Sequence, residues 1–261
     1  MIKSEKNGII YYEFEHMAAT ELVNHCFSTR IGGVSKTPYN SMNLAYHLDD
    51  CQQAVDENFR LICAAVGFDH EKIAMTQQIH QDTIQILTTT TKVVQNGVDG
   101  LITAATGPVL TTYYADCTPL LFFDPEKKVI ANSHAGWRGT ALNIAKKTVK
   151  QMIDNFACQP KNILAGIGPC ISLAHFEVGG EVVQAFKKQL PEVAPHLKRK
   201  NAQKWHLDLT AINYQLLIEA GLLEKNIETA NLCTYENANL FFSHRRDGLA
   251  RGNMVAMISL K

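Results

Sequence analysis

The strongest constraint on the fold is the balance between short strand-like stretches and longer helix-like ones. Stretches rich in β-branched and aromatic residues predict strands at residues 8–14, 25–30, 72–80, 83–87, 109–114, 119–124, 128–133, 162–168, 228–234, 240–245 and 254–260. Apolar residues recurring on one helical face predict helices at 52–66, 140–156, 179–190 and 208–220. Because strands outnumber helices and do not alternate regularly with them, we predict an α+β fold with a mixed β-sheet core and flanking helices.

Length and composition favour a single catalytic domain over residues 1–261. A chain of 261 residues with 46% hydrophobic and 19% charged residues is typical of an ordinary globular protein. No internal repeat or low-complexity linker divides it, and the four threonines at 88–91 predict a loop. We expect a monomer or a homodimer.

Charge and cysteine content exclude several classes of partner. Lys+Arg and Asp+Glu balance at 25 each, so no overall field favours nucleic acid or an anionic membrane. No stretch reaches the roughly 18 apolar residues of a membrane span, and the N-terminus lacks the apolar core of a signal peptide. The 7 cysteines are scattered without a CxxC pair, which predicts reduced thiols and a cytoplasmic protein.

The segment ADCTPLLFFDPEKKVIANSHAGWRG, residues 115–139, suggests a metal site. Its two apolar runs flank the turn-like DPEK and predict an antiparallel hairpin centred near Glu126. In that register Cys117 lies opposite about position 135, beside His134 at the open end of the hairpin. A thiolate next to an imidazole suits Zn²⁺ or copper, which both accept sulfur and nitrogen donors.

A third donor would complete this site, and His80 in the stretch QQIHQDT is the best candidate. Two histidines and one cysteine leave a fourth tetrahedral position open, as in catalytic rather than structural zinc sites. We expect Asp116 to orient a ligand from outside the coordination sphere. The spacing alone leaves a second interpretation open, in which the cysteine is a small core residue and the histidines are structural.

Seven motifs occur in a recognisable order: FSTRIGGVS (27–35), NSMNLAYH (40–47), QQIH (77–80), ADCTPLLFFDP (115–125), HAGWRGT (134–140), IGPCIS with FEVGGEV (167–182) and FFSHRRDG (241–248). Together they resemble the laccase-domain family, also called the multicopper polyphenol oxidase family, over nearly the whole chain. Its members are described as purine nucleoside phosphorylases with adenosine deaminase side activity. The resemblance implies that His80, Cys117 and His134 bind the metal.

Two positions depart from the family pattern. Gln81 follows His80 where the family usually has glycine. The Asn-Arg pair common in the first helix reads Asn58-Phe59 here, with Arg60 next. Because one residue turns a helix by about 100°, Arg60 points to a different face from position 59, where the family pattern has arginine. The substrate role of that family arginine is therefore not carried over to Arg60.

Phosphorolysis of a purine nucleoside requires phosphate to be held beside C1′ of the ribose. Arg138, at the entrance to the helix predicted at 140–156, is the leading candidate for the phosphate ligand. Arg30 and Arg245 are further candidates for an anion, and Asn43 and Glu177 for the ribose or base. Each has a structural alternative: a surface or ion-paired arginine, a turn-forming asparagine or a helix-capping glutamate.

Other functions remain open at this point. The chain has 10 His and no HxH pair, too few imidazoles for the trinuclear copper cluster of a true laccase, although one site could serve a single-copper polyphenol oxidase. A hydrolase that edits peptidoglycan precursors would use the same metal on an amide or ester bond. The zinc-deaminase pattern HxE with PCxxC is absent, so adenosine deamination would need a different site design. A non-enzymatic metal-binding protein would not need Arg138 and Arg30.

Overall fold

Two β-sheets stacked face to face form the centre of the computed structural model, which describes residues 1–88 and 91–261. The first sheet has the strand order β1 (Ile2–Lys6), β2 (Ile9–Glu13), β3 (Val23–Ser28), β16 (Met254–Leu260), β8 (Val109–Tyr114), β4 (Ile73–Gln77) and β6 (Val93–Asn96). The second has the order β15 (Ile227–Thr229), β11 (Leu164–Ile167), β9 (Thr118–Asp124), β10 (Val129–Ala135), β7 (Gly100–Thr103) and β5 (Ile84–Ile86). Both sheets contain parallel and antiparallel pairs.

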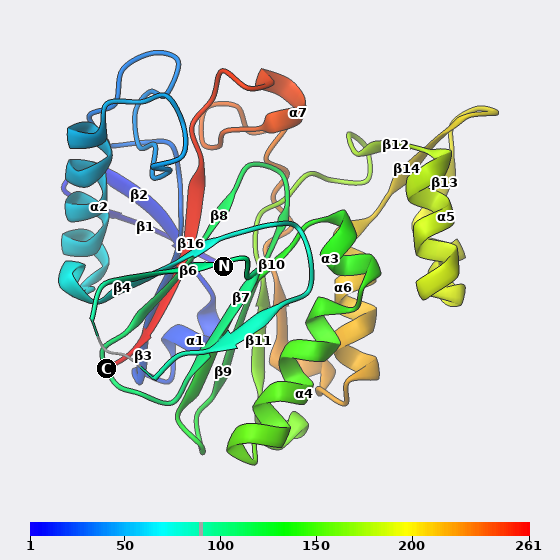
Figure 1. Cartoon of the computed structure of the whole chain (residues 1–261), viewed down its shortest axis with the longest axis horizontal. Helices are drawn as coiled ribbons and strands as arrows, with labels where there is room; N and C mark the ends of the chain where they lie inside the picture. The colour runs from blue at the N-terminus through cyan, green and yellow to red at the C-terminus, as the bar shows by residue number, and fades with distance from the viewer. Residues whose placement is uncertain (89–90) are drawn as a thin grey trace.

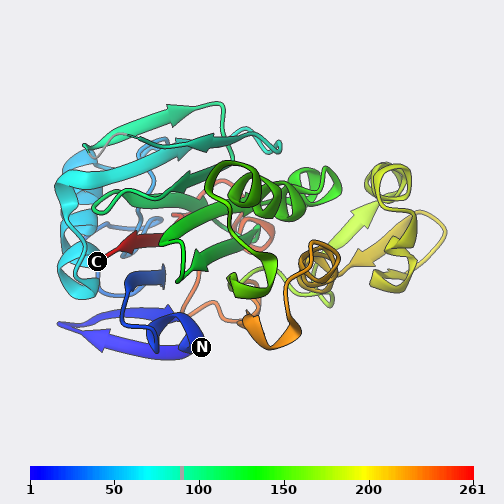
Figure 2. The same ribbon diagram turned by 90° about the horizontal axis from the view of Figure 1, so that it is seen from below.

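Helices cover the outer faces of this sandwich (Figures 1 and 2). Helix α2 (Gln52–Val66) covers the first sheet, and α4 (Ile144–Phe156) with α6 (Leu209–Glu219) covers the second. Short helices α1 (Glu15–Ala18), α3 (Trp137–Ala141) and α7 (His244–Asp247) lie in the connections. A three-stranded sheet of β12 (Glu177–Gly179), β14 (Lys204–Leu207) and β13 (Leu197–Arg199) projects to one side with α5 (Gly180–Gln189), as Figure 2 shows.

The central strands are apolar without interruption because both of their faces are buried. In β9, Leu120 and Phe122 pack towards α4 and α6, whereas Leu121 and Phe123 pack between the sheets. Side chains alternate along a strand, so each central strand supplies two cores at once. This alternation positions the hairpin of β9 and β10 in the middle of the protein, with both strands fully buried.

The predicted α+β class with a mixed sheet core and flanking helices is confirmed. The helix predicted at 52–66 has the observed bounds, and the hairpin forms with Val129 paired to Asp124 and His134 to Pro119. Its last pair, Thr118 with Ala135, places Cys117 next to Gly136, one residue from the predicted register. None of the helices in the described part of the chain combines the length and apolar character needed to cross a bilayer.

Three predicted elements are wrong in detail. The stretch 240–245 is not a strand, because turn hydrogen bonds from Leu240 and Phe241 to the carbonyl of Asn237 replace a strand ladder. The helix predicted at 140–156 is two helices, α3 and α4, separated where Asn143 adopts a left-handed φ of 65°.

The strand predicted at 228–234 ends early. It stops at Thr229, two residues before Asn231, which also has a positive φ, of 51°. Strand β1, the strands β6 and β7, and the small sheet lie largely or wholly outside the predicted elements. The loop predicted at 88–91 falls in part on residues 89 and 90, outside the described residues.

Candidate metal centre

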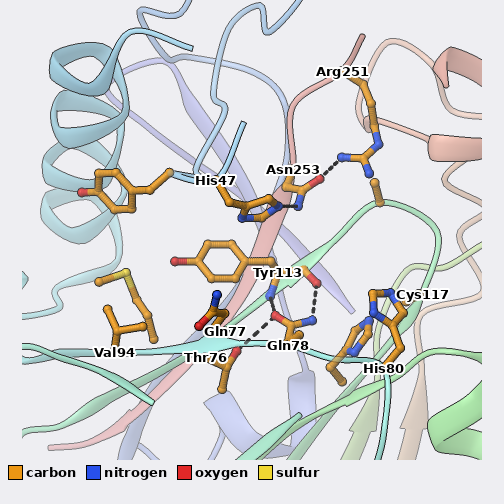
Figure 3. Close-up of a pocket in the computed structure, with 14 residues that line it drawn as sticks. His47, Thr76, Gln77, Gln78, His80, Val94, Tyr113, Cys117, Arg251 and Asn253 are labelled. Atoms are coloured by element: carbon orange, nitrogen blue, oxygen red, sulfur yellow. Dashed lines mark hydrogen bonds between the residues drawn. The ribbon is translucent and has the colours of Figure 1, made fainter. Parts of the chain in front are cut away.

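Three segments far apart in sequence bring His80, Cys117 and His134 together. His80 follows β4, Cys117 lies between β8 and β9, and His134 is near the end of β10. Their ligand atoms all lie within 4.8 Å of one another. The two imidazole rings meet edge to face with centroids 4.8 Å apart. Figure 3 shows His80 and Cys117 side by side at one end of a hollow.

A buried carboxylate, Asp99, holds two members of this triad. Its side chain accepts a hydrogen bond from Nδ1 of His134 at 2.8 Å. It also accepts the backbone N–H groups of Ile79, His80 and Gln81 at 3.2, 3.0 and 2.9 Å. His80 has a φ of 58°, and this bundle of three N–H donors around one carboxylate stabilises that left-handed conformation.

Asp116, which we expected to orient a ligand, has other partners. Its carboxylate accepts hydrogen bonds from the hydroxyls of Thr234 and Ser243 at 2.6 and 3.0 Å and from the backbone of Arg245 at 2.7 Å. Among the described residues it therefore ties the Cys117 loop to α7 and contacts neither histidine ring. Asp99 occupies the orienting position instead. The sequence offered one signal for it, an acidic residue inside the otherwise apolar segment 98–102.

The electrostatics of the triad favour a charged thiolate. Burial alone would raise the pKa of Cys117, but the imidazoles of His134 and His80 lower it overall. Burial would likewise lower the pKa of His134, yet the Cys117 sulfur and the Asp99 carboxylate raise it. A metal cation bound to the sulfur would replace the imidazole protons as the positive charge that stabilises the thiolate.

The residues present fit a soft or borderline metal ion such as Zn²⁺ or copper. One sulfur and two nitrogens are the donors these ions prefer, and three protein ligands leave one position for a substrate. Gly136 keeps the space between the donors open. A methyl group there would lie 3.2 Å from Sγ of Cys117, 3.3 Å from Cδ2 of His80 and 3.4 Å from Cε1 of His134.

Two hollows meet at the triad, and the first is aromatic and largely uncharged. It has a volume of about 610 Å³ and is lined by His80, Cys117 and His134. His80 and Cys117 lie at one end of it, with Val94 towards the other (Figure 3). Tyr46, His47, Tyr113, Gln78 and Asn253 contribute to its walls, and Arg251 is its one arginine or lysine among the described residues. This size suits a drug-sized organic ligand.

The second hollow is lined by charged side chains of both signs and lies between the body of the protein and the small sheet. It has a volume of about 580 Å³ and shares His80, Cys117 and Arg251 with the first. Arg138, Lys204 and Arg245 also line it, as do the acidic residues Asp116, Glu177 and Glu181. The guanidinium of Arg138 lies over the ring of Trp137, 4.2 Å from its centroid, and that of Arg245 lies 5.4 Å from the ring of Phe176.

Two of the residues predicted to bind substrate, Arg138 and Glu177, line the second hollow. Arg138 belongs to the first turn of α3, rather than to a loop ahead of a helix as predicted. Glu177 lines the hollow but already pairs with Lys200 at 2.6 Å and Lys204 at 3.7 Å. The hydrogen bond from Lys200 lowers the pKa of the Glu177 carboxyl.

The structure does not bring Arg30 and Asn43 to either hollow. Arg30 donates to the carbonyls of Asn40 and Ala238 and lies over the ring of Phe242, beside a separate surface depression. Asn43 is fully buried, and its amide bonds the backbone N–H groups of Ala45 and Asn253. Asn43 thus holds Asn253, a wall residue of the first hollow, whereas Arg30 joins the loops that carry Asn40 and Ala238.

Sequence reasoning also missed several wall residues. His47, Tyr113, Arg251 and Asn253 come from three different segments, and their convergence depends on the packing of β8 beside β16. His47 closes the quoted motif NSMNLAYH, which was the one signal available for it. Arg251 and Asn253 precede the last strand, and nothing in their local sequence marks them as part of a site.

Fold and site together define an α+β protein with a candidate His-Cys-His centre between two hollows. The family model described as multi-copper polyphenol oxidoreductase laccase matches residues 24–261. The chain therefore belongs to this family.

Named relatives agree with that assignment. The purine nucleoside phosphorylase of Deinococcus radiodurans is 38% identical over 91% of this chain and 89% of its own length. The purine nucleoside phosphorylase YlmD of Bacillus subtilis is 33% identical over 90% and 87%. The crystal structure of YlmD from Geobacillus stearothermophilus superposes with a TM-score of 0.93 at 31% identity, covering 99% of this chain and 98% of that one.

Proposed function

We propose that this chain is a zinc-dependent purine nucleoside phosphorylase with adenosine deaminase as a side activity. Its substrates would be adenosine, inosine, guanosine and S-methyl-5′-thioadenosine. The observation that carries the proposal is the position of the His80, Cys117 and His134 triad, where an aromatic hollow meets a second hollow that contains four basic side chains. The names of the relatives support the substrate class.

The reaction needs two binding environments of opposite character. An oxygen of phosphate forms a bond to C1′ while the bond from C1′ to the purine nitrogen breaks, giving the free base and ribose 1-phosphate. We assign the nucleoside to the first hollow, whose walls include Tyr113 and His47, because flat aromatic groups pack well on a purine. We assign phosphate to the second, because Arg138 and Arg245 can bind it through charge-assisted hydrogen bonds.

Arg138 suits the phosphate role better than the other candidates. Its guanidinium forms no ion pair among the described residues and is oriented by stacking on Trp137, which leaves its N–H donors available. Arg245 already donates to the carbonyl of His175 at 3.2 Å. Glu177, held by two lysines at the rim, is the candidate acceptor for ribose hydroxyls.

His80, Cys117 and His134 would hold the metal between these two environments. A bound Zn²⁺ would supply Lewis-acid chemistry, polarising an oxygen of phosphate or of the water that deamination consumes. The protein's own contribution is positioning: Asp99 holds the imidazoles, Gly136 keeps the centre open, and the paired hollows keep nucleoside and anion on opposite sides.

The test is incubation of the zinc-loaded protein with inosine or adenosine, with and without phosphate. We expect free base and ribose 1-phosphate only when phosphate is present, and inosine from adenosine in either buffer. Equal release of base without phosphate would show that the protein hydrolyses nucleosides and does not phosphorolyse them. If nucleosides are not turned over, hydrolysis of a peptidoglycan precursor would favour the editing hydrolase. Oxygen consumption with a phenol by copper-loaded protein would instead favour the single-copper polyphenol oxidase.

A further inference from the structure

Asp99 is the one carboxylate in the described part of the chain that contacts two of the three candidate metal ligands. It is completely buried, and each of its oxygens accepts two N–H groups: Oδ1 those of His134 and His80, Oδ2 those of Ile79 and Gln81. We propose that Asp99 is a positioning residue that fixes the ring of His134 in one tautomer and the His80 loop in one conformation. The inference rests on the metal site of the proposed function.

The backbone explains why an acidic residue at position 99 reaches both histidines. Asp99 immediately precedes β7, which pairs with β10, so its carbonyl accepts the backbone N–H of His134 at 2.7 Å. Gly100 allows this close approach, because a methyl group there would lie 2.8 Å from Oγ of Ser133. The side chain of Asp99 then turns towards the segment 79–81, which follows β4 of the other sheet.

The contact with His134 determines which ring nitrogen can bind a metal. An ionised carboxylate only accepts hydrogen bonds, so Nδ1 of His134 must carry the proton that bridges the 2.8 Å gap to Oδ1. The lone pair of the neutral ring is then on Nε2, the nitrogen left for the triad. Hydrogen bonding of one nitrogen to a carboxylate is the usual way in which proteins orient a metal-binding histidine.

The contacts with residues 79–81 act on His80 through its backbone. A residue other than glycine with a φ of 58° is disfavoured, and the three N–H groups gathered on one carboxylate offset that cost. Asp99 is not itself a candidate ligand, since both of its oxygens are already occupied by N–H donors. Its effect on a bound metal would therefore pass through the two histidines.

The substitution Asp99→Asn tests this role because it preserves size. Asparagine has one acceptor oxygen, so it can accept only one of the two pairs of N–H groups. With that oxygen on the N–H groups of Ile79 and Gln81, its amide nitrogen donates to Nδ1 of His134 and favours the tautomer with the proton on Nε2. We expect a loss of roughly 10- to 100-fold in Zn²⁺ affinity, measured by competition with a chromophoric chelator without any nucleoside.

Asp124→Asn is the matched control. Asp124 is also completely buried and accepts two backbone N–H groups, from Glu126 and Lys127, but it lies at the opposite end of β9 from Cys117. We expect this variant to keep the Zn²⁺ affinity of the wild type even where it lowers the unfolding midpoint. Equal affinity losses in the two variants, or none in Asp99→Asn, would overturn the proposal.

A second measurement uses the unmodified chain and so does not depend on a variant that folds. Long-range ¹⁵N–¹H correlation of the Zn²⁺-loaded protein should show His134 protonated on Nδ1, and the opposite tautomer contradicts the role of Asp99. If the affinity difference holds while no nucleoside is turned over, the proposed function fails and the positioning role stands. If nucleosides are turned over with no affinity difference, only the positioning role fails.

Discussion

His25 and His134 are both buried histidines on central strands, and they differ in almost every property that matters for function. Their side chains are 1% and 2% exposed. His25, on β3, accepts the backbone N–H of Phe14 at Nε2 and stacks parallel to the Phe14 ring, while its Nδ1 has no hydrogen-bond partner in the described structure. His134, on β10, has the Asp99 carboxylate on one side and the Cys117 sulfur on the other.

These partners move the two pKa values in opposite directions. Burial lowers the pKa of His25 to about 4, and the nearby charge of His16 adds to the effect. Burial also acts to lower the pKa of His134, but the thiolate and the carboxylate outweigh it and raise the value. Burial therefore does not separate a structural histidine from a functional one, whereas the charges in contact with the ring do.

The first prediction is that removing the Cys117 thiolate, the charged partner of His134, abolishes metal binding. We expect wild-type protein to bind about one Zn²⁺ per chain, given one His-Cys-His set, and Cys117→Ala to bind none. Metal analysis after dialysis measures this. Cys63→Ala is the control, because Cys63 is another buried thiol whose pKa is raised, by burial, to about 12. Full metal content in Cys117→Ala would show that the triad is not the site.

The second prediction concerns the anion side of the triad. If Arg138 binds the attacking phosphate, Arg138→Ala removes a charge-assisted contact worth on the order of 2–3 kcal/mol. Phosphorolysis should fall by roughly 30- to 150-fold, and Arg138→Lys should recover only part, because an ammonium lacks the planar fork of donors.

Zinc content and adenosine deamination serve as internal controls for Arg138. Arginine is not a candidate ligand, and deamination consumes water rather than phosphate. Both should be nearly unchanged in Arg138→Ala, as measured by metal analysis and inosine release. A parallel fall of deamination and phosphorolysis, with metal retained, would instead place Arg138 at the nucleoside.

The third prediction concerns His25 and the stability of the fold at acidic pH. The pKa of His25 is about 4 in the folded protein and about 6.5 in the unfolded chain, so between these values only the unfolded chain binds the proton. Its contribution to stability is complete above pH 6.5 and is lost as pH falls towards 4. At pH 5 the loss should be about 2 kcal/mol, since one pKa unit corresponds to about 1.4 kcal/mol.

Urea unfolding of wild type and His25→Gln at pH 7 and pH 5 measures this contribution. Glutamine can accept the N–H of Phe14 and does not titrate, so the variant should lose less stability between the two pH values. Equal losses in both proteins would mean that His25 becomes protonated without cost, and that its environment is less distinct from solvent than its burial implies.

Local sequence was sufficient to predict the hairpin of β9 and β10 and the proximity of Cys117 to His134 at its open end. An apolar run, a four-residue turn and a second apolar run predict the hairpin and its register to within one residue. The alternation of side chains does not define the register further, because both faces of these strands are buried. His80 was found as a third donor by chemistry and not by geometry. Its approach depends on β4 joining β8 in parallel, which no local pattern indicates.

Two features could not be predicted from the sequence. They are the role of Asp99 and the division of the helix predicted at 140–156. Asp99 acts through backbone N–H groups of residues 79–81, and a sequence does not show where a carboxylate's donors come from. The break at Asn143 leaves apolar residues of both halves buried in one core, so the helical period continues across it. Tertiary packing decides both features.

The smallest effect is expected for Arg60→Ala. This variant tests whether the partners of an arginine, like those of a histidine, distinguish a structural side chain from a functional one. Arg60 directly follows Phe59, which is buried with its ring centroid 5.4 Å from that of the stacked Tyr46 ring. Arg60 lies on the exposed side of α2 and donates from Nε to Glu57 at 2.7 Å. Exposed pairs of this kind contribute little, so Arg60→Ala should leave phosphorolysis within about twofold of wild type and the unfolding midpoint nearly unchanged. Steady-state rates at saturating inosine and phosphate measure this, with Arg138→Ala as the comparison. A loss in Arg60→Ala approaching that of Arg138→Ala would mean that α2 moves to bring Arg60 to the first hollow.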